Sequence, residues 1–333
     1  MEAWASDHGA RLVGFGPGWG KCVEVDLAAG AEEEACASQV RQIDGIEAVL
    51  TASRPTHHVA GAGREPQRIE VGPARFGGGF ASAIAGPCSV EEHDSLLALA
   101  WQLRRAGATA LRGGAFKPRT SPYSFQGLGR PGLEILRSVS DQTGLPVVTE
   151  VLDPRAVELV AEFADVLQIG SRNMMNYALL SEAGGAGRPV LLKRGMSATL
   201  GEFLLAAEYL AHAGCSRILL CERGLRHFDP TVRNLLDLAA VPALKRVTHL
   251  PVVVDPSHGT GSAALVPAML AAAAAAGADG FLVEVHPDPR HSVSDASQAL
   301  SPEVFATALE RASKVLEACD RRLARPAAET QPV

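Results

Sequence analysis

Three cationic side chains crowd one short, glycine-rich stretch, LRGGAFKPRTSPYSFQG, at residues 111–127. Arg112, Lys117 and Arg119 follow an apolar strand pattern within eight positions, and Pro118 separates the last two. The chain of 333 residues carries a net charge of -6, so this positive charge is a local feature. Guanidinium and ammonium groups at such density favour phosphate or carboxylate ligands.

Polar residues recur at the ends of the short apolar segments throughout the second part of the chain. The set comprises Cys88, Arg112, Glu150, Arg172, Lys193, Arg194, Glu222, Arg223, Asp255, His258, Glu284 and His286, with Lys117, Arg119 and Asp295 in the loops beyond. The same segments begin with Ala81, Ala108, Pro146, Pro189 and Pro251. This asymmetry indicates that the chemistry lies at one end of the strands.

The apolar segments alternate with amphipathic, helix-like segments from residue 81 onward. The expected strands cover residues 81–87, 108–114, 146–151, 165–170, 189–195, 217–224, 251–257 and 280–287. Eight such units predict a (β/α)8 barrel, an α/β fold of roughly 250 residues whose active site lies at the carboxyl ends of the strands. The alternative is an open doubly wound sheet, which needs a topological switch point and usually has fewer strands.

The first part of the chain has a different pattern. We expect a small α+β unit at residues 1–63, with a glycine-rich loop (GFGPGWG), a strand at KCVEVDL, a helix and one or two further strands. Residues 64–80 are expected to form a linker with a hairpin, 81–325 the barrel and 326–333 a disordered tail.

The rim residues divide into two chemical sets. Cys88, His258, Glu284 and Asp295 combine soft and hard donors that could hold one divalent cation. The cations Arg112, Lys117, Arg119, Arg172, Lys193 and Arg223 would repel one another unless an anion neutralised them. The expected ligands are therefore small, multiply anionic metabolites.

Several of these residues have plainer interpretations. Taken alone, Cys88 is more often a small core residue than a ligand, and His258 has a similar alternative. Glu150, Asp255 and Glu222 are interpreted as structural partners that orient the arginines, and Arg194 is expected to point away from the rim. Cys215 and Cys221 lack the spacing of a zinc pair.

Composition excludes several function classes. The acidic balance argues against nucleic acid and anionic membranes as partners. The sequence contains no apolar run of a membrane span's length, no signal-peptide pattern at the N-terminus and no CxxC pair among its six cysteines. We therefore expect a cytoplasmic protein with free thiols.

The motifs in their order resemble the 3-deoxy-D-arabino-heptulosonate 7-phosphate (DAHP) synthases of type Iβ and their sister 3-deoxy-D-manno-octulosonate 8-phosphate (KDO8P) synthases. They are AGPCSVE, LRGGAFKPRTSPYSFQGLG, LPVVTEV, LQIGSRNMMNYALL, PVLLKRGM, LCERGLR, LPVVVDPSHGTG and VEVHPDP…SDASQAL. The loop HFDPTVRNLLDL departs from the family pattern, which has threonine, glutamate and more hydroxylated residues there.

The resemblance implies roles for the residues at the rim. Cys88, His258, Glu284 and Asp295 match metal ligands for one divalent ion, Mn²⁺, Co²⁺, Zn²⁺ or Fe²⁺. Arg112, Lys117, Arg172, Lys193 and Arg223 match the grip on phosphoenolpyruvate, and Arg119 and Thr120 the grip on the aldose phosphate. Lys117 and His258 are the expected catalytic proton carriers, and a water held by Glu150 is a further candidate.

The implied activity is that of a transferase, the condensation of phosphoenolpyruvate with erythrose 4-phosphate in the shikimate pathway to the aromatic amino acids. Pro118 favours erythrose 4-phosphate, since the octulosonate enzymes have asparagine there. The alternatives are a KDO8P-type synthase that uses a five-carbon aldose phosphate, an inactive regulatory barrel, and a DAHP synthase paralogue of specialised metabolism. We expect a homodimer or homotetramer. The N-terminal unit resembles part of the ferredoxin-like domain that senses an aromatic amino acid in type Iβ enzymes.

Overall fold

The chain divides into two compact units, Met1–His57 and His58–Val333. The computed structural model describes residues 1–14, 23–46, 48–51, 55–61, 63–117, 121 and 123–327. Residues 58–61, which the sequence assigned to the N-terminal unit, are bonded to the second unit. Gly61 N donates to Val247 O at 2.9 Å, and Ala60 forms an antiparallel bridge with Thr248.

The N-terminal unit contains helix α1 (Glu2–Asp7), strands β1 (Arg11–Gly14) and β2 (Val23–Asp26), and helix α2 (Glu33–Val40). The two strands are antiparallel, with Arg11 opposite Asp26. The expectation of further strands after α2 is wrong for the described residues of 47–61, which form no strand. The amides of His58 and Val59 instead donate to the Glu208 carboxylate, at 2.8 and 3.0 Å, so a side chain replaces the strand partner. Gly14, the first residue of the expected glycine-rich loop, ends β1, and residues 15–20 of that loop lie outside the described residues, as do residues 328–333 of the expected tail.

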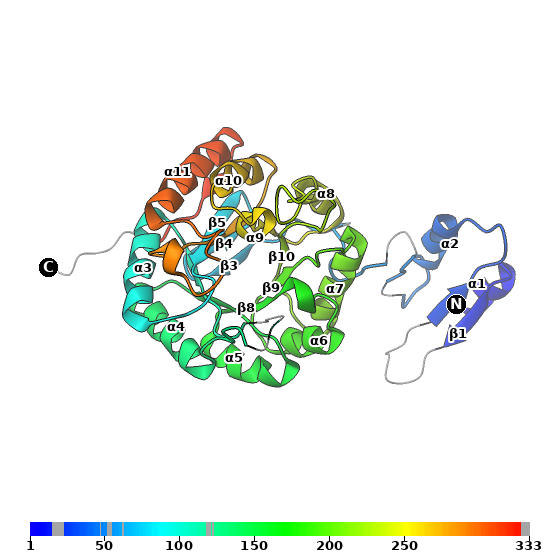
Figure 1. Ribbon diagram of the computed structural model, residues 1–333. Helices are drawn as coiled ribbons and strands as arrows, with labels where there is room; N and C mark the ends of the chain where they lie inside the picture. Colours follow the sequence, from blue (N-terminus) through cyan, green and yellow to red (C-terminus); the bar gives the residue numbers. More distant parts are fainter. Residues whose placement is uncertain are drawn as a thin grey trace. The chain divides into compact units, whose positions relative to one another are not determined.

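In the second unit, eight parallel strands of the described chain form a closed ring (Figure 1). They are β5 (Phe80–Gly86), β6 (Ala110–Arg112), β7 (Val147–Glu150), β8 (Val166–Ile169), β9 (Val190–Lys193), β10 (Ile218–Glu222), β11 (Val252–Val254) and β12 (Gly280–Glu284). Strand β12 pairs with β5, with Gly280 opposite Ser82. This pairing confirms the barrel, because an open sheet would leave β5 and β12 apart.

Helices surround the ring (Figure 1). They are α3 (His93–Ala106), α4 (Arg130–Thr143), α5 (Val157–Phe163), α6 (Tyr177–Gly185), α7 (Leu200–His212), α8 (Ala240–Val247), α9 (Pro256–Thr260), α10 (Val266–Ala275) and α11 (Pro302–Ala318), and a short strand β13 (Arg322–Leu323) follows beside β5. Helix α4 shows why they pack, since it buries Leu133, Leu136 and Val139 on one face. No helix in the described ranges is long and apolar enough to cross a membrane.

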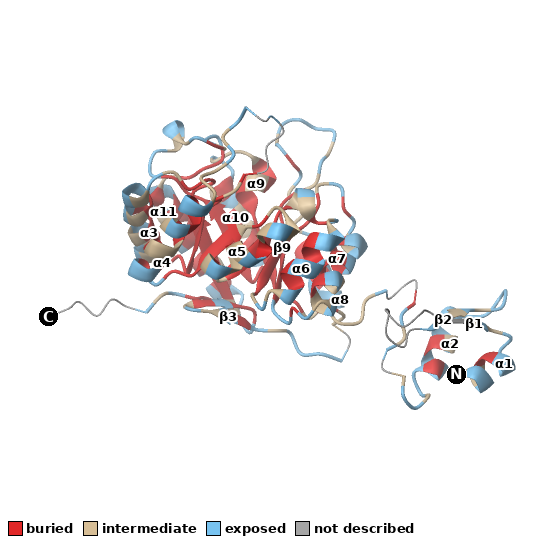
Figure 2. Ribbon diagram, turned by 90° about the horizontal axis from the view of Figure 1, so that it is seen from below, coloured by how far each residue is buried: buried red, intermediate tan, exposed pale blue. Residues whose placement is uncertain are grey.

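A hairpin closes the amino-terminal end of the ring. Strands β3 (Ile69–Val71) and β4 (Ala74–Phe76) pair antiparallel, and Ile69 and Phe76 share an apolar cluster with barrel residues such as Leu191. A Cβ atom at Gly280 would lie 2.9 Å from the Phe76 ring, so only glycine lets the ring approach this closely. Figure 2 shows β3 at one end of the barrel and α9 at the other.

Candidate active site

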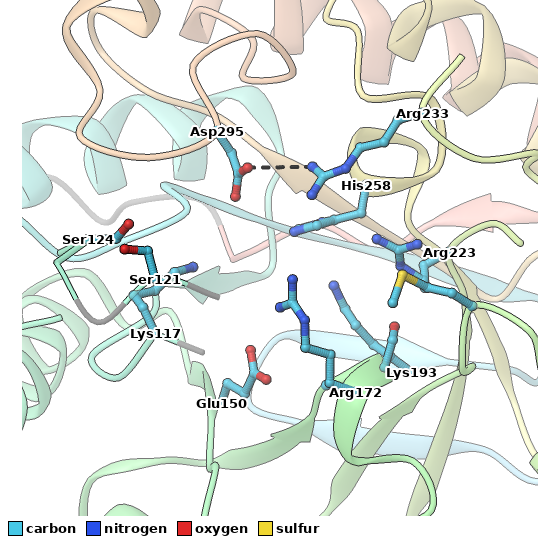
Figure 3. A pocket seen from close by; sticks show the side chains of 13 residues that line it. Lys117, Ser121, Ser124, Glu150, Arg172, Lys193, Arg223, Arg233, His258 and Asp295 are labelled. Carbon is cyan, nitrogen blue, oxygen red and sulfur yellow. Dashed lines mark hydrogen bonds and ion pairs between the residues drawn. The ribbon is translucent and has the colours of Figure 1, made fainter. Parts of the chain in front are cut away.

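A cavity of about 360 Å³ opens at the carboxyl ends of the strands. Of the described residues, five cations line it, namely Lys117, Arg172, Lys193, Arg223 and Arg233. Glu150, His258, Asp295, Ser121 and Ser124 are also in the lining. Figure 3 shows Arg172, Lys193 and His258 pointing into the same space. The ring therefore brings together residues from loops that are far apart in the sequence.

Three predicted metal ligands meet where the ring closes. One ligand atom each from Cys88, Glu284 and Asp295 lies within 4.8 Å of the others. Cys88 follows β5 and Glu284 ends β12, and these strands pair with Gly86 opposite Glu284. The Cys88 thiol donates to Asp295 Oδ2 at 3.0 Å. The backbone of Asp295 has φ 51, a left-handed conformation that non-glycine residues adopt mainly where local structure demands it.

The fourth predicted ligand, His258, lies beside this group on α9. Asp255 caps the helix and accepts from both the backbone N and the ring Nδ1 of His258, at 2.9 and 2.8 Å. Because Nδ1 donates, Nε2 carries the lone pair, and it lies 3.4 Å from Glu284 Oε1. Two donor atoms bound to one tetrahedral ion, each by a bond of about 2.1 Å, lie about 3.4 Å apart. The distance between His258 Nε2 and Glu284 Oε1 therefore matches that of two ligands of one ion.

The electrostatics of the group also fit a cation. Burial raises the pKa of the Cys88 thiol to about 12, and the Glu284 carboxylate adds to the rise. Burial opposes ionisation of Asp295, but the Cys88 hydrogen bond and nearby His258 hold the pKa of its carboxyl at about 2. Burial lowers the pKa of His258, which favours the neutral, ligating ring. Glu284 Oε1 is buried, accepts no hydrogen bond in the described structure and is ion-paired with Arg112 at 3.1 Å. The donor set of Cys88, Glu284 and Asp295, with His258 Nε2 beside Glu284, therefore fits a divalent ion.

The cation side of the cavity is tied to this group. Lys193 Nζ contacts Asp255 Oδ2 at 2.5 Å, on the carboxylate that also holds His258. Lys117 Nζ donates to Cys88 O and Sγ at 2.9 and 2.8 Å. The positive groups and the candidate metal ligands therefore form one site.

The family described as "DAHP synthetase I family" matches residues 68–320, which span the hairpin and the whole barrel. The chain belongs to the DAHP synthetase I family. It is 46% identical to a phospho-2-dehydro-3-deoxyheptonate aldolase of Thermotoga maritima over 290 residues. These residues cover 87% of this chain and 86% of the relative. A 2-dehydro-3-deoxyphosphooctonate aldolase of Syntrophotalea carbinolica is 36% identical over 71% of this chain and 91% of the relative.

Solved structures of the DAHP synthetase family have the same architecture. The crystal structure of the phospho-2-dehydro-3-deoxyheptonate aldolase (DAHP synthase) from Thermotoga maritima matches 97% of this chain and 94% of its own, with a TM-score of 0.81 and 41% identity. A truncated form of 3-deoxy-D-arabino-heptulosonate 7-phosphate synthase from the same organism covers 80% of this chain and 98% of its own, with a TM-score of 0.75 and 45% identity.

Arg112, a predicted substrate residue of this DAHP synthetase family member, is buried and is not among the residues that line the cavity. It is 5% exposed and pairs with Glu284 Oε1 at 3.1 Å, and it donates to Cys88 O at 3.4 Å. Its Nε makes no hydrogen bond within the described structure. Burial opposes its charge, but the Glu284 carboxylate raises the pKa of Arg112 above its usual value. The group is therefore a buried, charged donor with spare capacity.

Of the three acidic residues expected to orient arginines, Glu222 does so in the described structure. Glu222 contacts Arg194 at 2.9 Å, and Asp237 holds the same guanidinium at 3.1 Å, so Arg194 is held away from the cavity lining. Glu150 does line the cavity and accepts from the Gln168 amide at 3.3 Å. Asp255 differs from its expected role, because its partners are Lys193 and His258 rather than an arginine.

Three predicted residues of the family motif cannot be placed. Pro118, Arg119 and Thr120 lie outside the described residues, so their assignment to the aldose phosphate stays a prediction. The adjacent Ser121 and Ser124 line the cavity.

Sequence reasoning missed Arg233 and Gln298. Arg233 lines the cavity and contacts Asp295 Oδ1 at 3.5 Å and Gln298 Oε1 at 2.9 Å. Arg233 belongs to the loop that departs from the family pattern, after β10, and a cation in a loop at the carboxyl end of a strand was the available signal. Gln298 is uncharged, and its residue type carried no signal of a functional role in the sequence.

Proposed function

We propose that this chain is a DAHP synthase, which condenses phosphoenolpyruvate with erythrose 4-phosphate and water to give DAHP and phosphate. The observation that carries the proposal is a cavity of about 360 Å³ lined by five cations, His258 and Asp295, with Cys88 and Glu284 within contact distance of those last two residues. The heptonate relative is more similar, and over more of the chain, than the octonate relative, which supports the four-carbon substrate.

We propose one divalent ion held by Cys88, His258, Glu284 and Asp295. When bound, it would supply Lewis-acid polarisation of the aldehyde oxygen. Mn²⁺, Co²⁺, Zn²⁺ and Fe²⁺ all accept a thiolate, imidazole and carboxylate donor set. Asp255 supports this assignment because it fixes the ring tautomer in which His258 Nε2 is free to bind.

The cationic residues hold two anionic substrates against their mutual repulsion. We assign Arg112, Lys117, Arg172, Lys193 and Arg223 to the phosphate and carboxylate of phosphoenolpyruvate, and Arg119 and Thr120 to the aldose phosphate. Such fixed charges orient the reacting carbons and stabilise the charge that develops during the reaction. Lys193 suits this role because Asp255 fixes its ammonium group at the cavity wall.

In the proposed reaction, carbon 3 of phosphoenolpyruvate forms a bond to the aldehyde carbon, and the aldehyde oxygen gains a proton. Water adds at carbon 2 and loses a proton. The bond between carbon 2 and the phosphate oxygen then breaks, and loss of the second water proton leaves the ketone of DAHP and free phosphate. Lys117 and His258 are the proposed proton carriers, because both line the cavity. Lys117 Nζ contacts the proposed ligand Cys88, and His258 is itself a proposed ligand. A water on Glu150 is a further candidate, since that carboxylate also lines the cavity.

The test is phosphate release from phosphoenolpyruvate, with erythrose 4-phosphate or arabinose 5-phosphate, before and after EDTA treatment. We expect release with the four-carbon aldose, loss of activity with EDTA and recovery on adding a divalent ion. Faster release with the five-carbon aldose would replace the proposal with a KDO8P-type synthase. Binding of phosphoenolpyruvate without any phosphate release would favour an inactive regulatory barrel.

We further propose a homodimer or homotetramer, a cytoplasmic location and an aromatic amino acid as effector of the N-terminal unit. Light scattering on the purified chain measures the oligomer. Phosphate release with added phenylalanine, tyrosine or tryptophan measures feedback, and unchanged rates with all three would fit a paralogue of specialised metabolism.

A further inference from the structure

The two oxygens of the fully buried Glu284 have different surroundings. Oε2 accepts a hydrogen bond from Gln298 Nε2 at 2.6 Å. Oε1 receives no hydrogen bond in the described part of the chain, although Arg112 Nη1 and His258 Nε2 lie 3.1 and 3.4 Å away. Oε2 is therefore engaged by the Gln298 amide, and Oε1 has only ionic neighbours, one of which is the imidazole of His258.

The orientation of the Gln298 amide follows from its two partners. Gln298 is fully buried, and its Oε1 accepts from Arg233 Nη1 at 2.9 Å while its Nε2 donates to Glu284. A guanidinium only donates and a carboxylate only accepts. Rotating the amide by half a turn would set donor against donor and acceptor against acceptor, so Arg233 and Glu284 together fix which way Gln298 faces.

Arg233 is itself fixed to the segment that carries His258. Its backbone N donates to Thr260 O at 3.0 Å, and the neighbouring Asn234 side chain donates to His258 O at 2.9 Å. A Cβ atom at Gly261 would lie only 2.6 Å from Arg233 Cβ, so the glycine lets the two segments touch. The guanidinium also reaches Asp295 Oδ1 at 3.5 Å, which Figure 3 marks.

We propose that Arg233 and Gln298 are positioning residues that make Glu284 offer Oε1 alone to a divalent ion. The chain of contacts runs from Arg233 to Gln298 and from Gln298 to Glu284 Oε2. It leaves Oε1, which accepts no hydrogen bond and is ion-paired with Arg112, as the oxygen beside His258 Nε2. This inference rests on the proposed metal site. Outer partners of this kind commonly change metal affinity by about 10–100-fold when they are removed.

The test is titration of the EDTA-stripped full-length chain with Co²⁺, followed by the near-ultraviolet absorbance of the cobalt–thiolate bond. We expect Gln298→Ala to weaken Co²⁺ binding by about 10–100-fold and Arg233→Ala by up to about tenfold. Arg233→Lys retains a donor for Gln298 and should recover part of the loss. Arg226→Ala is the matched control, because Arg226 is an exposed arginine of the same loop, and its affinity should equal that of the wild type.

The double variant Gln298→Ala/Arg233→Ala separates a chain of contacts from two independent effects. If Arg233 acts through Gln298, the double variant binds Co²⁺ within about threefold of Gln298→Ala, because only the weak Asp295 contact is additionally lost. The proposal would be overturned if the fold-loss of Co²⁺ affinity in the double variant equalled the product of the fold-losses in the two single variants. Co²⁺ affinities of both single variants within about threefold of the wild type would also overturn it, whatever happens to their thermal stability.

Two further outcomes keep the result unambiguous. If Gln298→Ala does not fold, Arg233→Ala decides alone, and wild-type affinity in that variant overturns the proposal. Wild-type protein that binds Co²⁺ but releases no phosphate with either aldose would remove the proposed function and leave this inference standing. Wild-type protein that fails to bind Co²⁺ would remove the metal site and this inference together.

Discussion

The two ends of the barrel differ in the kind of side chain that they bury. At the amino-terminal end, the hairpin of β3 and β4 inserts Ile69 and Phe76 into a cluster of aliphatic side chains. At the other end, the buried polar groups include Arg112, Lys193 and Glu284. Removal of apolar side chains from water stabilises the amino-terminal end. At the other end, each buried charge needs a specific partner to offset the cost of its desolvation.

The apolar end of the barrel therefore mainly stabilises the fold, and the charged end mainly serves the activity. Buried ion pairs such as Arg112 with Glu284 and Lys193 with Asp255 usually add little net stability, because desolvation offsets their attraction. Burial of an apolar side chain such as that of Phe76 contributes several kcal/mol to the free energy of unfolding. Substitutions at the charged end should therefore change activity far more than folding, and substitutions at the apolar end should do the reverse.

The largest expected effect is loss of turnover in Cys88→Ala or His258→Ala. Removal of a ligand from the proposed ion should lower phosphate release by at least about 10³-fold, because the aldehyde is then not polarised. The thermal unfolding midpoint of the metal-free protein should stay close to that of the metal-free wild type. Full activity in metal-stripped Cys88→Ala would remove the metal assignment.

Phe76→Ala should have the opposite profile. Loss of this buried ring should lower the free energy of unfolding of the barrel by about 3–5 kcal/mol, measured by urea denaturation. The kcat for phosphate release at a temperature where the protein is folded should equal that of the wild type. A large fall in kcat with unchanged stability would show that the two ends are not separate.

The pH dependence of metal binding tests the charged end more finely. With a pKa raised to about 12, the Cys88 thiol keeps its proton in the metal-free protein at neutral pH and must lose it to bind an ion. The pKa of His258 is lowered, so its ring is already neutral above pH 7 and releases no proton. Co²⁺ affinity should therefore rise about tenfold per unit between roughly pH 7 and 9. Calorimetry in buffers of different ionisation enthalpy should count one released proton, and a flat profile would contradict the protonated thiol.

The smallest expected effect concerns the aldose side of the charged end. Pro118→Asn should weaken the use of erythrose 4-phosphate by several-fold, because proline fixes φ and offers no side-chain hydrogen bond to a sugar hydroxyl. The measurement is kcat/KM with erythrose 4-phosphate and with arabinose 5-phosphate. Unchanged values for both would remove Pro118 as the residue that selects the aldose.

Much of the barrel could be predicted because its signals are local. Each apolar strand is short, continuous and buried on both faces, and polar residues begin where it ends, as at Glu150, Lys193 and Glu284. The rule that parallel strands share one functional end then gathers Cys88, His258 and Glu284 before any coordinates are known. The boundary of the N-terminal unit was harder to predict, because the amides of residues 58 and 59 find their acceptor on Glu208 of the second unit, about 150 residues away.

The sequence alone determined the ring of strands, the end that carries the chemistry and the residue types gathered there, because strand periodicity and strand ends can be recognised from neighbours in the chain. Only the tertiary structure decided which of those groups touch. It joins Lys193 and His258 through Asp255, it pairs the buried Arg112 with Glu284, and it brings Arg233 to Gln298. Such pairings depend on ring closure and on side-chain directions across different strands and loops, which spacing along the chain does not contain.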